Sequence, residues 1–389
     1  MVLRVSLNPE LLLWARERAG LDQAALVTRF KKLPEWEDGR LKPTLKQLER
    51  YARAVHVPLG CLFLKSPPKE SLPITDFRTI GGAVVQRPSP NLLDTIYACQ
   101  ERQDWYQDYA KISGFDELEF VGSANLASAP TSVAEEMRKE TGFDLETRKN
   151  FRTWSESLRQ LMKKVDQIGV LIMVNGVVNN NTQRKLSLAE FRGFALSDRY
   201  APLIFVNGQD SKSAQIFTLA HELAHIWLGS TGLSNNSVEP IRHTRTEEVW
   251  CNSVAAEFLV PMKDFQSQLD QKESLEEALD RLARRFKVST LVVLRRLYDA
   301  DWIDQDIFRA TLKQQLGRLQ ELSLRRSSGG NFYHTNIARV GERFARALIS
   351  NTLEGFTLYK DAYRMLGVRK AQTFKGLVQK VGLENWHNI

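Results

Sequence analysis

Apolar residues recur at helical spacing over most of the chain, and the first such segments form a compact module. Apolar positions 11, 12, 15 and 19 predict a helix over Pro9–Ala19. Two more helices are predicted over Asp22–Phe30 and Thr44–Val55, and Thr44 begins the latter with the spacing of a capping box. The run Ser66–Pro68 favours extended backbone and ends the module.

Helical periodicity continues through the rest of the chain. Capping signals at Ser132, Ser274 and Ser289 mark further helix starts. The Ser327–Gly330 run predicts a linker or a tight turn. The other predicted helices are Asn91–Ile112, Ser132–Thr141 and Phe151–Val165 and, near the end of the chain, Thr335–Asn351, Leu353–Leu366 and Gln372–Val381.

Strand-like patterns are confined to one zone. Gly169–Val174 is a short, β-branched apolar run and predicts a buried strand. Phe191–Leu196 and Ala201–Val206 flank the turn-like Ser197–Tyr200 and predict a hairpin. The expected fold is therefore mostly α with a small β-sheet, an α+β protein.

Composition places the protein among ordinary globular chains. Of 389 residues, 43% are hydrophobic and 26% are charged, which excludes disordered, collagen-like and membrane-embedded proteins. The longest apolar run, 168–174, is far shorter than the ~20 residues that span a bilayer. The N-terminus lacks a signal-peptide pattern, and the three cysteines are widely spaced. We therefore expect a cytoplasmic protein without a disulfide framework.

Positive charge is concentrated at both ends of the chain. Residues 1–70 carry a net charge of +5 and residues 320–389 a net charge of +6, whereas the residues between them carry −3. Basic ends suit a nucleic acid or an acidic partner, although they also suit simple solubility.

The segment 217–227 contains the pattern with the clearest chemistry, H-E-x-x-H. His221 and His225 are four residues apart, so on a helix they share one face and both can reach one zinc ion. Glu222 projects beside that face and can accept a proton from a water molecule that zinc activates. The alternative is a pair of helix histidines without a metal.

Such a zinc site needs a third protein ligand and an open position for water. Several downstream side chains are suitable, so the residues themselves leave this ligand open. A loop histidine is more often solvated, and a cysteine at this place fits a packing role better than a ligand role. The candidates are His243, Glu247, Glu248, Cys251 and Glu257.

The segment Glu248–Pro261 resembles the second motif of the ImmA/IrrE family of metallopeptidases, roughly E-x-x-A-N-x-F-A-A-x-x-L-x-P. The H-E-x-x-H helix is similar to the first motif of that family. The resemblance implies a zincin-like, gluzincin-type peptidase domain. It also implies zinc ligands and a base at the matching positions, which are His221, His225 and Glu248 for the metal and Glu222 for the base.

The predicted strand shortly before the H-E-x-x-H helix is a candidate for substrate binding. In zincin-like folds, an edge strand lies above the zinc ion and pairs with the extended substrate. We expect this role for Leu203–Asn207, with Leu203, Phe205 and Asn207 at the substrate. A plain core strand fits the apolar run equally well.

The N-terminal module resembles an XRE-type helix-turn-helix through Leu12–Leu21, Trp36–Gly39 and Lys42–Leu48. The resemblance implies a recognition helix in the major groove of DNA. This chain is shorter than the pattern where that helix begins, and Pro34 limits a helix there. A module for dimerisation or partner docking is the alternative. The expected DNA contacts are Arg29, Lys31, Lys32, Arg40 and Lys42.

The expected organisation is a peptidase core with helical modules on either side. The segment Leu282–Leu297 has the pattern of a second helix-turn-helix. We favour a role in structural packing over DNA binding for this segment. The expected parts are a helix-turn-helix-like module (1–66), a helical connector (67–129), the zincin-like peptidase domain (130–265), a helix-turn-helix-like helical subdomain (266–320) and a basic helical C-terminal region (321–389).

Together these features predict a cytoplasmic, zinc-dependent endopeptidase coupled to transcriptional regulation. The resemblance implies that it cleaves a specific repressor or partner protein, and DNA binding and a homodimer are expected by analogy. The alternative is an antitoxin-type DNA-binding regulator that neutralises a cognate toxin by binding, with proteolysis secondary or absent.

Overall fold

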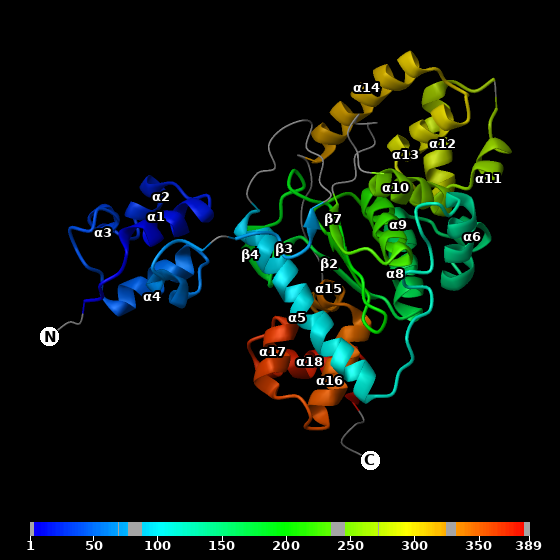
Figure 1. Cartoon of the computed structure of the whole chain (residues 1–389). Helices are drawn as coiled ribbons and strands as arrows, with labels where there is room; N and C mark the ends of the chain where they lie inside the picture. Colours follow the sequence, from blue (N-terminus) through cyan, green and yellow to red (C-terminus); the bar gives the residue numbers. More distant parts are fainter. Residues whose placement is uncertain are drawn as a thin grey trace. The chain divides into compact units, whose positions relative to one another are not determined.

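The structure is a computed structural model, and it describes residues 4–68, 70–76, 88–234, 246–270, 272–323 and 332–384 (Figure 1). The chain divides into two compact units. The first comprises residues 1–73 and 86–96, and the second comprises residues 74–85 and 97–389. The H-E-x-x-H segment therefore lies in the second unit.

The first unit contains short helices around an apolar core. These are α1 (Pro9–Arg18), α2 (Gln23–Val27), α3 (Leu33–Glu37), α4 (Leu45–Ala54) and a 3₁₀ helix (Leu59–Phe63). The predicted capping box at Thr44 is confirmed, because the Thr44 hydroxyl accepts from the Gln47 N–H and the Gln47 side chain accepts from the Thr44 N–H. Trp36 and Tyr51 lie in the core together with leucines of α1.

Helix α3 lies in the stretch where the sequence is shorter than the helix-turn-helix pattern. Pro34 is in the first turn of α3, where a proline lacks no hydrogen bond, so it begins the helix rather than preventing it. The helix spans only Leu33–Glu37, and Leu33 and Trp36 are buried. The preceding helix ends at Val27, earlier than the predicted Phe30.

The second unit is built on a five-stranded mixed sheet in the order β1-β7-β5-β6-β2. Its strands are β1 (Thr75–Asp76), β2 (Leu171–Asn175), β5 (Gly193–Leu196), β6 (Leu203–Asn207) and β7 (Gly232–Ser234). A separate ribbon pairs β3 (Val177–Val178) with β4 (Asn181–Lys185). Strands β5 and β6 form the predicted antiparallel hairpin, with Leu196 opposite Leu203. The prediction of a mostly helical protein with a small sheet is confirmed.

One face of the sheet is covered by the helices that carry the motifs (Figure 1). These are α8 (Trp154–Gln167), α9 (Lys212–Leu228) and α10 (Thr246–Leu259), with α6 (Pro130–Thr141) and α7 (Leu145–Lys149) beside them. Because side chains alternate along a strand, Ile204 and Val206 of β6 face α9 and share one core with its apolar residues. This packing fixes α9 against the middle of the sheet.

The opposite face carries α5 (Pro90–Ile112). From this helix Arg102 donates to the Met365 carbonyl and approaches the sulfur of Met173 in β2. The C-terminal helices also pack in this part of the second unit, as α15 (Phe332–Val340), α16 (Glu342–Leu353), α17 (Tyr359–Leu366) and α18 (Ala371–Lys380). The C-terminal region is thus an integral part of the unit that contains the sheet.

Some predicted helix boundaries were wrong, for local reasons. The predicted helix 335–351 is two helices, because Gly341 between them has a φ of +86°. An added Cβ at Gly341 would lie 2.8 Å from the Ile172 carbonyl oxygen. Helix α6 begins at Pro130 rather than at the predicted capping residue Ser132. The signals at Ser274 and Ser289 are confirmed as N-caps, and the Ser327–Gly330 run lies outside the described residues.

The remaining helices are α11 (Met262–Gln266), α12 (Leu275–Phe286), α13 (Thr290–Asp299) and α14 (Gln305–Ser323). Helices α12 and α13, with the residues between them, contain the segment Leu282–Leu297, whose pattern resembles a second helix-turn-helix. Buried residues of both helices belong to the core around α9 and α10. In the described part of the chain, no helix combines the length and the apolar character that crossing a membrane requires.

Candidate metal centre

Helix α9 presents the two histidines of the motif in a single direction. Ser211 caps its N-terminus and Gly229 ends it in a left-handed conformation with a φ of +73°. Four residues apart, His221 and His225 lie on one face, and their Nε2 atoms are 3.1 Å from each other. Both imidazoles are fully buried. The histidines therefore converge on one point inside the protein.

Glu248 of α10 completes this group. Its carboxylate oxygens lie 3.1 Å from His225 Nε2 and 3.4 Å from His221 Nε2. One ligand atom from each of these three side chains lies within 4.8 Å of the others. All three residues are buried. The structure thus brings together the three residues that the sequence comparison with the ImmA/IrrE motifs marked as ligands.

The other candidates for the third metal ligand that the structure describes do not belong to this group of three residues. Glu257 pairs with Arg296 at 2.6 Å, and Glu247 approaches the Nδ1 atom of His225 rather than the Nε2 atoms. Cys251 is buried but does not belong to the three-residue group. His243 lies outside the described residues.

Two side chains of α10 contact the outer nitrogens of the histidines. The Asn252 amide oxygen lies 3.0 Å from His221 Nδ1. Because an amide oxygen only accepts, this contact places the proton on Nδ1 and leaves a lone pair on Nε2. On the other imidazole, Glu247 lies 3.5 Å from His225 Nδ1 and accepts a hydrogen bond from Ser230. Both contacts favour the tautomer whose Nε2 atom can bind a metal.

Burial and the neighbouring histidines shift the pKa values of Glu222 and Glu248 in opposite directions. Burial raises the pKa of Glu222 above its usual range. Burial also acts to raise the pKa of Glu248, but the neighbouring histidines outweigh it and lower that pKa to about 2. The histidines therefore favour the charged form of Glu248, and burial favours the neutral form of Glu222.

These residues fit a divalent metal ion. Two imidazoles and one carboxylate form a donor set that zinc has in catalytic sites, where a further position stays open for water. The carboxyl of Glu222 is fully buried, and its Oε2 atom has no hydrogen-bond partner among the described residues. A buried acceptor without a partner is costly, so the site is suited to receiving a water molecule or a substrate group.

Two further residues position Glu222 and were not anticipated from the sequence. The Ser234 hydroxyl of β7 donates to Glu222 Oε1. Gly193 of β5 leaves room for the same carboxyl, because a Cβ at this position would lie 2.8 Å from Glu222 Oε1 and 2.6 Å from Thr218 Cγ2. The available signal was the glycine inside a predicted strand, which often marks a close approach.

The predicted role of Leu203–Asn207 as a substrate-binding edge strand was wrong. This segment is β6, which pairs with β5 on one side and with β2 on the other, so its backbone has no free edge. Its five residues are buried, and Leu203 and Phe205 alternate with the residues that face α9. The alternative reading as a plain core strand is the correct one.

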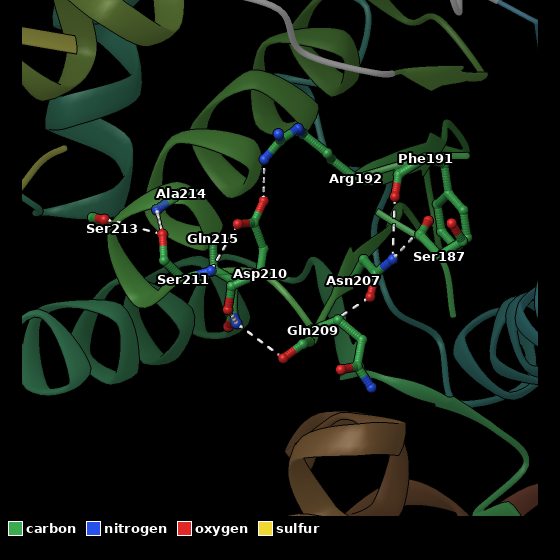
Figure 2. Close-up of polar contacts among 11 residues, drawn as sticks. Ser187, Phe191, Arg192, Asn207, Gln209, Asp210, Ser211, Ser213, Ala214 and Gln215 are labelled. Atoms are coloured by element: carbon green, nitrogen blue, oxygen red, sulfur yellow. Dashed lines mark hydrogen bonds and ion pairs between the residues drawn. The ribbon is translucent and has the colours of Figure 1, made fainter. Parts of the chain in front are cut away.

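Asn207 instead holds the turn that leads into α9 (Figure 2). Its amide donates to the carbonyls of Phe191 and Ser187, and its oxygen accepts from the Gln209 N–H. Next to it, Asp210 forms an ion pair with Arg192, and Gln215 donates to the Asp210 carbonyl. This network fixes the start of the histidine helix.

The five positions expected to contact DNA lie in the first unit. All of them are exposed, and they lie after α2, before α3 and between α3 and α4; they are Arg29, Lys31, Lys32, Arg40 and Lys42. Arg40 forms an exposed ion pair with Asp38. Their role in DNA binding stays a prediction.

Comparisons with known proteins agree with the geometry of the metal centre. Residues 168–298 match the family model for peptidase family M78, the IrrE N-terminal-like domain. Residues 340–380 match a domain of unknown function, DUF8813. A comparison with curated proteins found no match. The matched span 168–298 includes His221, His225 and Glu248, and this part of the chain is similar to metallopeptidase domains of the IrrE kind.

Proposed function

We propose that the protein is a zinc-dependent endopeptidase that acts in transcriptional regulation by cleaving a specific repressor or partner protein. The observation that carries the proposal is the buried group of His221, His225 and Glu248 with the Glu222 carboxyl beside it. A structural zinc site has no need of a buried carboxyl oxygen without a hydrogen-bond partner, whereas a peptidase needs a base at this place.

In this proposal, three residues would bind the metal and Glu222 would transfer the proton. His221, His225 and Glu248 would hold zinc, which would polarise the scissile carbonyl and lower the pKa of water. Glu222 accepts a proton from the attacking water and passes it to the leaving amine. Burial raises the pKa of Glu222, which favours the protonated form that donates in the second step. Ser234 holds one oxygen of Glu222 and leaves the other for the water.

Positive charge near both ends of the chain supports a role for this activity in regulation through DNA or a partner protein. The exposed basic residues of the first unit and the net charge of +6 over residues 320–389 suit DNA or an acidic protein. We propose the first unit as an XRE-like, DNA-binding or dimerising module. Binding of a cognate toxin without cleavage is the competing function, and the same exposed residues favour it equally.

Co-expression with the products of the neighbouring genes tests the proposal. We expect a partner to be cleaved by the wild-type protein and to copurify intact with Glu222→Gln, which keeps the metal ligands. His221→Ala is the second control, because it removes metal and activity together. Mass spectrometry identifies the cleaved bond. Cleavage at the normal rate by Glu222→Gln would show that the mechanism is wrong, and a partner that stays uncut with the wild type would favour the toxin-binding function.

A further inference from the structure

The outer edges of the sheet differ in what covers them. At the β2 edge, the Leu171 N–H points to the neighbouring strand β6, so the Ile172 carbonyl faces outward. The Gly341 Cα approaches that carbonyl so closely that an added Cβ would lie 2.8 Å from it. The junction of α15 and α16 therefore closes this edge to a peptide.

The other side of the sheet ends beside the proposed base. Strand β7 pairs with β5 through Gly232, Leu233 and Ser234. Its last residue, Ser234, donates to Glu222. A peptide that extended the sheet along the outer edge of β7 would therefore run toward Glu222. This edge has the position that a substrate-binding strand requires, and β6 does not.

The chain itself pairs with that edge. Thr75 lies opposite Gly232 and Asp76 opposite Leu233, in parallel orientation, which makes β1 the outermost strand. The preceding Ile74 is buried, with 8% of its surface exposed, whereas Thr75 is exposed. Ile74 thus anchors a short strand whose backbone occupies the hydrogen-bonding groups of β7.

This strand follows directly on the first unit. Glu70 forms an ion pair with Arg18 of α1 at 2.7 Å, and four residues separate Glu70 from Thr75. A strand of two residues makes few hydrogen bonds, so its pairing is weak and can be exchanged for a longer peptide.

We propose that the chain's own segment Ile74–Asp76 blocks the outer edge of β7, where an extended substrate would pair with the sheet, until a substrate displaces it. The inference rests on the proposed peptidase function and adds its regulation. Such a block would explain why a protein whose His221, His225 and Glu248 are already assembled cleaves a specific partner rather than any unfolded chain.

Peptide binding to the full-length, zinc-loaded Glu222→Gln protein tests this inference without any need for cleavage. The probe is a fluorescent peptide with the sequence of residues 70–76, and the readout is fluorescence anisotropy. Ile74→Asp removes the anchor of β1, and Ser71→Asp is the matched control, because it adds the same charge at an exposed position before the strand. We expect Ile74→Asp to bind the peptide at least tenfold more tightly than the parent or the control.

A second variant and a second measurement guard against misfolding. Thr75→Pro removes an N–H and disfavours the strand without placing a charge in the core. In both variants, hydrogen exchange at Gly232–Ser234 is expected to accelerate while zinc content stays unchanged. Equal peptide binding by all proteins, or no binding by the two variants, would overturn the inference. If the variants bind the peptide but no form with Glu222 cleaves a partner, the proposed function fails and the docking surface stands.

Discussion

The metal centre and the N-terminal unit both bury polar side chains between helices, but they resolve the cost of that burial differently. In the N-terminal unit, the Tyr51 hydroxyl donates to the Leu12 carbonyl at 2.7 Å. Glu37 accepts from Arg16 at 2.8 Å and from Gln23 at 2.6 Å. Each of these groups finds a complementary partner inside the unit, so they stabilise the fold.

At the metal centre, ionisable side chains from α9 and α10 converge on one point. Two imidazole nitrogens and the Glu248 carboxylate converge, and one oxygen of Glu222 lacks a hydrogen-bond partner among the described residues. Burying such groups costs stability unless something else satisfies them. Buried atoms without a hydrogen-bond partner among the described residues also occur in the N-terminal unit, at Trp36 Nε1 for example. The difference therefore teaches that the convergence of ionisable side chains on one point, rather than burial alone, distinguishes a functional site.

Among the residues that orient a ligand without binding the metal, the largest effect is expected at Glu247. Its carboxylate lies beside the outer nitrogen of His225, so Glu247→Gln should weaken zinc binding by about 10- to 100-fold, as for other groups that orient a metal-binding histidine. Competition with a chromogenic chelator measures the affinity. Glu146→Gln changes the same charge in an exposed pair with Lys149 and should leave the affinity unchanged. An unaltered affinity in Glu247→Gln would show that Glu247 does not orient His225.

A methyl group at Gly193 should disturb the metal centre from the sheet side. Its Cβ would lie 2.8 Å from Glu222 Oε1 and 3.0 Å from the Phe205 carbonyl, so Gly193→Ala should cost about 1–3 kcal/mol of stability and misplace the base. Gly317→Ala is the matched control, because that glycine is in a helix with open space around it. Thermal unfolding and partner cleavage measure the effects. Equal behaviour of the two variants would contradict the tight fit at Glu222.

A buried carboxyl outside both regions tests whether a raised pKa alone marks a functional site. Burial raises the pKa of Asp166 to about 6, and its side chain accepts from the Arg343 N–H. Since the folded-state pKa is the higher one, ionisation destabilises the fold as pH rises from about 4 through 6. Asp166→Asn should therefore gain on the order of 1–2 kcal/mol relative to wild type at pH 8 and nothing at pH 4.

Denaturant unfolding of both proteins across this pH range provides the measurement for Asp166. Zinc affinity should be the same in the two proteins, because Asp166 supports the contact between α8 and α16 rather than the metal. A loss of zinc in Asp166→Asn would break the contrast between structural and functional carboxyls.

The smallest effect is expected in the N-terminal unit. Tyr51→Phe removes the hydrogen bond to the Leu12 carbonyl and should cost about 1 kcal/mol of local stability. Hydrogen exchange of amides in α1 and α4 reports on this unit alone. Zinc affinity should not change. If zinc binding weakened, the N-terminal unit would be coupled to the metal centre more directly than we propose.

The sequence predicts those features that depend on neighbours along the chain. The spacing of His221 and His225 on a helix, and the capping box at Thr44, follow from local geometry. Glu248 required the resemblance to a family motif, since the residues alone left Glu247 equally suitable. The order of strands is not local, so the apolar run at Leu203 was assigned to an edge although it lies inside the sheet. Ser234 meets Glu222 only through the pairing of β7 with β5, which no local pattern reveals.

The measurement that tests the central claim most directly is a zinc titration of the full-length protein and two variants, Glu248→Ala and Glu247→Ala. The account predicts one tightly bound zinc ion in the wild type. In Glu247→Ala, one zinc should remain with an affinity lowered by about 10- to 100-fold, and in Glu248→Ala the loss should exceed that range, because a ligand rather than its support is removed. A wild-type protein that binds no zinc, or a Glu248→Ala variant that binds it as tightly as the wild type, would contradict the account.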